Sequence, residues 1–221
     1  MPFSPLHLLL FIFLLGFLLA FVQIGIFTIA FDKLGLSPHS AMLLLFTSLF
    51  GSAINLPLFS VRAERPPEIP PVPPQIRGLL RQVMREFTGR TVIAVNVGGC
   101  LIPLFFSAYL LKHHPLPLDQ VFLAVALVSG VCYTFSRPIP GMGIGMPVFV
   151  APLTAALVAL MINSEHSAPL AYISGTLGVL LGADILRLGD IRRMGVPLAS
   201  IGGAGTFDGI FLTGIIAVLL A

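Results

Sequence analysis

Residues 178–221 read GVLLGADILRLGDIRRMGVPLASIGGAGTFDGIFLTGIIAVLLA, two apolar segments that each carry one acidic residue. Asp184 lies inside the first segment, and Asp208 follows a glycine-rich run in the second. An acidic side chain inside a membrane span costs roughly 2.5 to 3.5 kcal/mol on insertion scales, so such a residue is kept for function or for pairing. We therefore expect the site of this protein at Asp184 and Asp208.

The composition predicts an all-α protein of the membrane. Of the 221 residues, 57% are hydrophobic and 10% are charged, whereas soluble domains carry about 25% charged residues. A chain of this length has room for about seven spans of ~20 residues. We expect a polytopic transmembrane helix bundle in the inner (plasma) membrane, with the lipid bilayer as its surroundings and without a cofactor, a metal or a nucleic-acid partner.

The apolar segments divide the chain into three regions. We expect transmembrane helices 1 and 2 in residues 1–61 and helices 3 to 7 in residues 91–221. The expected spans cover residues 8–31, 40–61, 91–111, 121–135, 136–162, 168–188 and 198–221.

Residues 62–90 form the third region, a cytoplasmic linker that opens with the proline-rich run RAERPPEIPPVPP. Its second half places apolar side chains opposite basic ones at helical spacing, which predicts a basic helix on the membrane surface. The apolar positions are Leu79, Leu80, Val83 and Phe87, and the basic ones are Arg77, Arg81 and Arg85.

The basic residues predict the orientation, because cytoplasmic loops are enriched in Lys and Arg. With the 62–90 segment in the cytoplasm, only Lys33 and Lys112 lie outside. The ten on the cytoplasmic side are Arg62, Arg65, Arg77, Arg81, Arg85, Arg90, Arg137, Arg187, Arg192 and Arg193. This asymmetry predicts an N-terminus inside and a C-terminus outside.

Further polar residues fall in the cytoplasmic half of these spans. Asn55 and Asn96 lie there, and so does Asp184, about 6 Å from the end of its span. The run with Gly203 and Gly205 is a poor helix start, and Thr206 is a suitable N-cap for a helix with Asp208 in its first turn. Both acids would then face one cytoplasm-side cavity. In the alternative, structural reading, either acid pairs with Arg137 or Arg187, while Asp190 is solvated.

Three runs in the C-terminal half carry a resemblance to a known family. The runs RPIPGMGIGMP, LLGAD and SIGGAGTFDGIFLTG resemble an uncharacterised prokaryotic family of polytopic membrane proteins, a domain of unknown function. This resemblance implies a multi-pass membrane protein and no particular activity.

A looser resemblance links Asp184 and Asp208 to intramembrane aspartyl proteases of the presenilin and signal-peptide-peptidase kind. Asp184, followed by Ile185 and Leu186, is similar to the first catalytic aspartate, and Asp208 after Gly203 and Gly205 is similar to the second. Thr206 and Phe207 interrupt the contiguous Gly-x-Gly-Asp of that family. The resemblance implies hydrolysis of single-span membrane peptides by two carboxylates with separated pKa values.

Two other functions fit the same residues. A buried acid on a broken helix also binds and releases a cation or a proton in small transporters and channels. A structural role in membrane assembly is the third alternative. The pairs Gly178–Gly182 and Gly205–Gly209 have the spacing of helix dimerisation surfaces, so a homodimer is compatible with the sequence.

Overall fold

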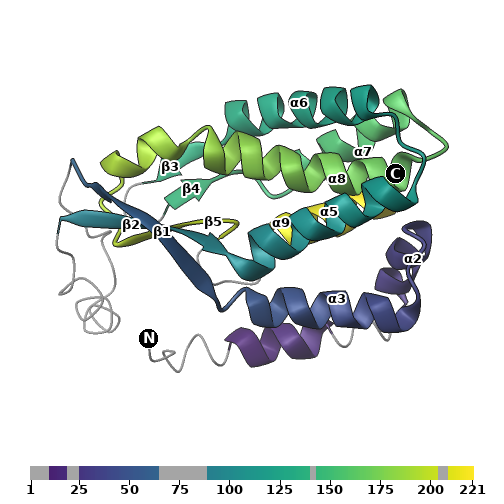
Figure 1. Ribbon diagram of the computed structural model, residues 1–221, viewed down its shortest axis with the longest axis horizontal. Helices are drawn as coiled ribbons and strands as arrows, with labels where there is room; N and C mark the ends of the chain where they lie inside the picture. Colours follow the sequence, from purple (N-terminus) through teal and green to yellow (C-terminus); the bar gives the residue numbers. More distant parts are fainter. Residues whose placement is uncertain (1–9, 19–24, 65–88, 140–142, 204–208) are drawn as a thin grey trace.

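The structure is a bundle of helices with a small sheet at one end (Figure 1). This computed structural model describes residues 10–18, 25–64, 89–139, 143–203 and 209–221. The predicted basic helix of the 62–90 segment lies outside the described residues.

A helix over residues 10–18 begins the described chain. The other α-helices are α2 (Ile26–Lys33), α3 (Pro38–Gly51), α5 (Ile102–His113), α6 (Leu118–Phe135), α7 (Val150–Ile162), α8 (Ser167–Val179) and α9 (Gly209–Leu220). Two π-helical segments, η1 (Val97–Leu101) and η2 (Leu180–Ile185), adjoin α5 and α8, and η3 (Leu188–Arg193) is a 3₁₀-helix. The strands are β1 (Asn55–Arg62), β2 (Arg90–Asn96), β3 (Arg137–Ile139), β4 (Gly143–Gly145) and β5 (Leu198–Ile201).

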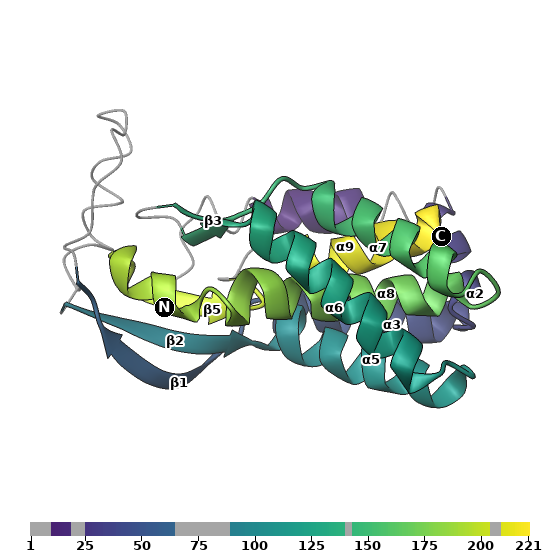
Figure 2. The same cartoon turned by 90° about the horizontal axis from the view of Figure 1, so that it is seen from above.

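Helix α8 is the centre of the bundle. Every residue of it except Leu177 is buried, and it contacts α5, α6, α7 and α9 (Figures 1 and 2). Small side chains let these neighbours approach closely: a β-carbon on Gly178 would lie 2.5 Å from a methyl carbon of Val128 in α6. A helix that is apolar all round is a buried helix, which explains its place at the centre.

The three-stranded sheet stands at the end of the bundle where α3 and η2 end (Figure 1). Strand β1 pairs antiparallel with β2, and β2 pairs parallel with β5. The bundle helices α5 to α8 therefore form part of the connection between two parallel neighbours. The β-branched run Thr91, Val92, Ile93 and Val95 favours a strand at β2.

These strands correct four of the expected helices. The last part of segment 40–61 is β1, and segment 91–111 begins with β2 and η1. The β3–β4 hairpin precedes α7, and β5 opens the last segment. Short apolar runs look the same in a buried strand and in a buried helix, so periodicity did not separate them.

The expected single helix over residues 8–31 is also corrected. The described part of the first helix reaches residue 18, and α2 begins after Gly25, whose φ of +79° is left-handed and interrupts a continuous helix. Helix α2 then continues to Lys33, two residues beyond the expected end.

The expectation of a mostly helical protein is confirmed, whereas seven full spans are not seen. Among the described residues, two helices are long and apolar enough to cross a membrane, Leu118–Phe135 and Ser167–Ile185. The other apolar helices are shorter, at 10 to 17 residues: Pro38–Gly51, Val97–His113, Val150–Ile162 and Ile210–Leu220.

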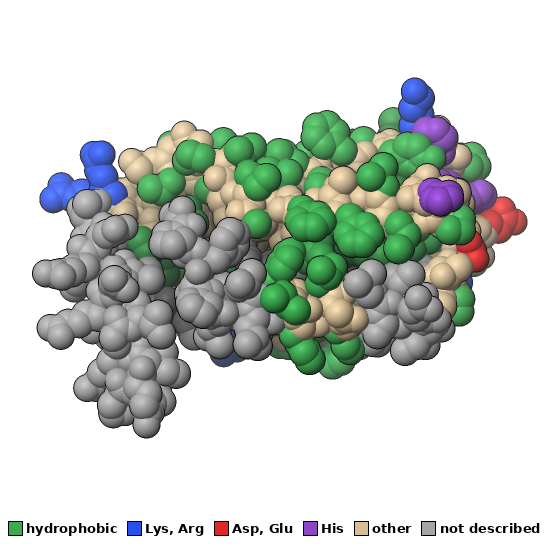
Figure 3. Space-filling view, turned by 90° about the horizontal axis from the view of Figure 1, so that it is seen from below, with side chains coloured by type: hydrophobic (Ala, Val, Ile, Leu, Met, Phe, Trp, Pro, Cys, Tyr) green, Lys and Arg blue, Asp and Glu red, His purple; other side chains and the backbone are tan. Residues whose placement is uncertain are grey.

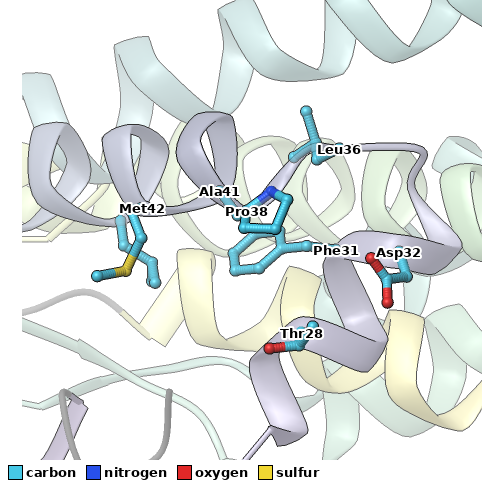
Figure 4. A pocket seen from close by; sticks show the side chains of 8 residues that line it. Thr28, Phe31, Asp32, Leu36, Pro38, Ala41 and Met42 are labelled. Atoms are coloured by element: carbon cyan, nitrogen blue, oxygen red, sulfur yellow. The ribbon is translucent and has the colours of Figure 1, made fainter. Parts of the chain in front are cut away.

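The end of the bundle opposite the sheet is held by polar contacts to α9. Lys33 Nζ donates to the carbonyl oxygens of Val218 at 3.3 Å and Leu219 at 3.5 Å, and Ser167 Oγ donates to that of Ala221 at 3.1 Å. A cation at a helix C-terminus satisfies carbonyls and opposes the helix dipole. Helices α2 and α3 enclose a mostly apolar hollow at this end, with Asp32 and Thr28 among its lining residues (Figure 4).

Candidate functional site

Asn96 joins the sheet to the bundle. Its Oδ1 accepts a hydrogen bond from the backbone N–H of Gly99 at 2.7 Å, so it caps η1. Its Nδ2 donates to the carbonyl oxygen of Ser52 at 2.7 Å and to Oδ1 of Asn55 at 3.0 Å. Only 1% of Asn96 is exposed, and its three bonds satisfy groups at the end of α3, at the start of β1 and in η1.

Ser200 extends this network to β5. Its hydroxyl donates to Oδ1 of Asn55 at 2.6 Å. The predicted residues Asn55 and Asn96 are therefore brought together, whereas Ser52 and Ser200 were not predicted. A serine on a short strand gives no sequence signal of this kind, because the pairing joins residues that lie 145 positions apart.

Asp184 lies in η2 and binds the chain that leaves β5. Its Oδ2 accepts a hydrogen bond from the backbone N–H of Gly202 at 2.7 Å. Gly202 has a φ of +86°, and a β-carbon there would lie 2.6 Å from backbone atoms of both Gly99 and Cys100. Only glycine fits this position, because the conformation and the close approach to η1 both exclude a side chain.

Only Ile201 separates Ser200 from Gly202, so the Asn55–Asn96–Ser200 network and the Asp184 carboxylate adjoin one chain segment. We call the group Asn55, Asn96, Ser200, Gly202 and Asp184 the junction site. It lies where the sheet meets η1 and η2, and both of these helical segments are π-helical. Such π-turns occur frequently at functional sites.

Arg187 is held away from Asp184. Its Nη1 pairs with Oδ2 of Asp190 at 3.1 Å, and its Nη2 donates to the carbonyl oxygens of Tyr133 at 2.7 Å and Ser136 at 2.9 Å. The guanidinium also lies 4.2 Å from the centre of the Tyr133 ring. Arg187 thus caps the C-terminal end of α6. The expected solvated Asp190 is instead its ion-pair partner.

The alternative in which Asp184 pairs with an arginine finds no support in the described part of the chain. The ion pairs in that part of the chain join Arg187 to Asp190 and, at 3.7 Å, Arg193 to Glu64. Arg137 is exposed in β3, where it pairs through its backbone with Gly145.

The glycine-rich run is described only in part. Gly203 has a φ of +94°, and its N–H donates to the carbonyl oxygen of Ser200 at 3.1 Å. Gly205, Thr206 and Asp208 lie outside the described residues. The distance between the Asp184 and Asp208 carboxylates is therefore untested.

Histidines and cysteines of the described ranges do not gather into a metal site. Within those ranges, no three His, Cys, Asp or Glu side chains are placed to hold one ion. His113 Nδ1 lies 2.8 Å from the carbonyl oxygen of Tyr109, and His114 Nε2 lies 3.3 Å from that of Leu34. Neither Cys100 nor Cys132 takes part in a disulfide.

The fold and the junction site define a helical protein with a buried polar centre between a bundle and a small sheet. Residues 49–220 match the family profile described as "Protein of unknown function (DUF1614)", so the chain belongs to the DUF1614 family. The match begins near the end of α3 and includes the whole junction site. No curated protein and no solved structure matches the chain.

Proposed function

We propose that this chain is a multi-pass membrane protein that binds and releases a proton or a small cation at Asp184. One observation carries the proposal: the Asp184 carboxylate accepts a hydrogen bond from a backbone N–H and has no basic partner among the described residues. An acidic residue in an apolar helix is explained by ion binding more readily than by a structural ion pair when no arginine pairs with it. The nearest arginine along the chain, Arg187, instead donates to the carbonyl oxygens of Tyr133 and Ser136.

The surface of the bundle supports the membrane part of the proposal. Large apolar side chains point outward from most helices, with Phe105 and Phe122 each 70% exposed. On the face in Figure 3, such side chains lie between charged groups at the two ends of the molecule. Soluble monomers rarely expose so large an apolar area, whereas a lipid-facing surface requires it.

Helix length is consistent with a bilayer for the two longest helices. At 1.5 Å per residue, the 18 residues of α6 and the 19 of α8 with η2 extend about 27 and 29 Å. The hydrocarbon core is ~30 Å thick. We expect β1 and β5, whose outer edges are open, to lie outside this core, because lipid cannot satisfy unpaired backbone groups.

The orientation follows from the ends of the bundle. Arg62, Arg90 and the arginines of η3 lie at the sheet end, while Lys33 and Lys112 lie at the opposite end. The excess of positive charge at the sheet end favours a cytoplasmic position for the sheet and the junction site.

We expect cysteines introduced at Arg192 and Lys112, both exposed, to react with a membrane-impermeant maleimide from opposite sides. In right-side-out vesicles Lys112→Cys should be labelled, and in inverted vesicles Arg192→Cys should be labelled. The parent chain, with its own Cys100 and Cys132, is the background control. Labelling of both positions from one side would contradict the proposed orientation.

A second function, hydrolysis of membrane peptides, is favoured by one contact. The hydrogen bond from Gly202 ties Asp184 to the start of the segment that leads to Asp208 and α9. If that segment brings the second carboxylate beside the first, the two pKa values separate, one group acting as base and the other as acid. Single-span membrane peptides would then be the substrates. A role in membrane assembly without ion transfer or hydrolysis is the third alternative.

The variant Asp184→Asn tests the proposal in proteoliposomes with an entrapped dye for H⁺ or Na⁺. The wild type should dissipate an imposed gradient of one of these ions, and the variant should do so at least about tenfold more slowly, a factor equivalent to 1.4 kcal/mol. Asp119→Asn is the matched control, because Asp119 is exposed at the far end of α6.

The same preparation is incubated with a panel of single-span peptides. Cleavage that is lost in Asp184→Asn, without ion flux in the wild type, would replace the ion-binding function by hydrolysis. If folded wild-type protein shows no ion flux and no cleavage, both functions are contradicted and the assembly role is favoured.

A further inference from the structure

We propose that the ion that reaches Asp184 is a proton, and that it travels along hydroxyl groups between α8 and α5. This inference rests on the proposed function and names its ion and its path. The path begins at Tyr172 and continues through Thr176 and Ser107 toward the junction site.

The three hydroxyl-bearing residues lie on facing sides of two helices. Tyr172 and Thr176 stand four residues apart in α8, so they share a face. Ser107 Oγ of α5 lies 3.1 Å from Thr176 Oγ1, and Phe106 of α5 meets the Tyr172 ring edge-on at 4.9 Å between centroids. Tyr172 and Thr176 are fully buried, and 3% of Ser107 is exposed.

The Tyr172 hydroxyl is one of two buried side-chain groups, with the hydroxyl of Ser129, for which the described residues offer no hydrogen-bond partner. Phenylalanine would fill the same space, and a buried unsatisfied hydroxyl lowers stability. Buried tyrosines normally find a partner for this group. A hydroxyl without a permanent partner can bind a partner transiently, and here we infer that this partner is a proton carried by a water molecule.

The π-turn of η2 places Asp184 on the same side of the helix as Tyr172. In a regular α-helix, the twelve residues between them would rotate Asp184 by about 120° from Tyr172. One extra residue in a π-turn removes about 100° of this rotation. The backbone shows the turn directly, because the N–H of Leu186 donates to the carbonyl of Leu181, five residues earlier, at 2.9 Å.

Contacts of Asp184 agree with this geometry. Its partner Gly202 lies against Gly99 and Cys100 of η1, and η1 leads directly into α5, which carries Ser107. Asp184 and the hydroxyl groups therefore adjoin the same continuous segment, η1 followed by α5. Along α8 and η2, Asp184 lies about 12 Å from Thr176 at 1.5 Å per residue.

Backbone groups of η1 occupy the interval between Ser107 and Asp184. Pro103, one turn before Ser107, is buried and has no N–H, so it cannot satisfy a carbonyl of the preceding turn. Such carbonyls can hold the water molecules that connect the hydroxyl groups to the carboxylate.

A proton fits this path better than a metal ion does. Each hydroxyl can accept a proton on its oxygen and donate its own to the next group. The Thr176 hydroxyl, which donates to the carbonyl oxygen of Tyr172 at 2.7 Å, rotates toward Ser107 to pass its proton on. One proton thus enters at Tyr172 and one leaves to Asp184. A cation would instead need several oxygen ligands around it. The Tyr172 ring is tightly packed, since a β-carbon on Gly214 of α9 would lie 2.8 Å from it.

The test compares proton flux into proteoliposomes under a potassium diffusion potential, with a pH dye inside. Tyr172→Phe and Thr176→Val remove a hydroxyl and keep the shape of the side chain. Each should slow the initial flux at least about tenfold. The matched control is Ser129→Ala, since the Ser129 hydroxyl is also buried without a partner among the described residues but belongs to α6, whose backbone at Ser129 lies against Gly178 and Gly182.

Folding is checked by thermal unfolding in detergent, where Tyr172→Phe should melt no lower than the wild type because no hydrogen bond is lost. Normal proton flux in both hydroxyl variants, with flux lost in Asp184→Asn, would overturn the path and keep the acid site. Normal flux in Asp184→Asn would overturn the proposed function itself. A wild type that carries Na⁺ and no protons would also overturn the path.

Discussion

Gly98→Ala is expected to abolish folding of the protein. A β-carbon at this position would lie 2.0 Å from the carbonyl oxygen of Ser48 and 2.3 Å from the backbone nitrogen of Ser52. Both obstacles are backbone atoms of the last turn of α3 and its end, so no side-chain rotation relieves the overlap. The Ser48 hydroxyl also donates to the carbonyl of Gly98 at 3.0 Å, and this bond would be lost as η1 moved away.

We expect a loss of more than about 4 kcal/mol, above the ~1 to 3 kcal/mol typical of overpacking, because the overlapping atoms belong to the backbone and cannot move aside. The measurement is the yield of monodisperse protein after detergent extraction, with thermal unfolding of whatever remains. Because α3 and η1 carry Ser52 and Asn96 into the junction site, the site would be lost with the fold.

Gly130→Ala is the control for this substitution. Gly130 lies within α6, and a β-carbon there would meet nothing within 4 Å. Alanine favours a helix over glycine by up to about 1 kcal/mol, so this variant should be as stable as the wild type or slightly more so. Equal stability of the Gly98 and Gly130 variants would contradict the close crossing of α3 and η1.

Asn96→Leu should produce the second-largest effect. Leucine has a similar shape but removes all three hydrogen bonds of the amide. The N–H of Gly99 and the carbonyl of Ser52 would then be buried without these partners. At about 1 to 3 kcal/mol for each unsatisfied group, the protein should lose roughly 3 to 5 kcal/mol.

The measurement is again thermal unfolding in detergent, with Asn163→Leu as the matched control. Asn163 also makes two side-chain bonds, to Gln120 at 2.9 Å and from the N–H of His166 at 3.0 Å, but it is partly exposed, so water can replace them. Its substitution should lower stability by only about 1 kcal/mol. An Asn96 variant as stable as the Asn163 variant would show that the junction network is not a source of stability.

Much of the helical architecture could be predicted from the sequence, because long apolar segments specify buried or lipid-facing helices. Helix α6 was expected at 121–135 and occupies Leu118–Phe135. The central helix was expected at 168–188 and occupies Ser167–Ile185 with its π-turn. Asn55 and Asn96, selected from the sequence as amides in apolar segments, are hydrogen-bonded to each other in the structure.

The strands could not be predicted in this way. The runs 55–62 and 90–96 are short and largely apolar, and neither contains a sequence signal that it pairs with the other. Their pairing joins residues up to 41 positions apart, with Asn55 opposite Asn96. Strand β5 pairs with β2 although helices α5 to α8 lie between the two strands in the sequence.

The sequence by itself determined that this chain is rich in apolar helices, that its positive charge is concentrated around one segment, and that Asp184 stands among apolar neighbours. Those properties are local or compositional, and each can be read within one segment. Only the tertiary structure decided the partners of the polar groups: Arg187 with Asp190 and the end of α6, and Asp184 with the N–H of Gly202. The physical reason is that a hydrogen bond or an ion pair forms where the fold brings two groups within about 3 Å, and that approach is set by the close crossing of backbones at Gly98 and Gly202.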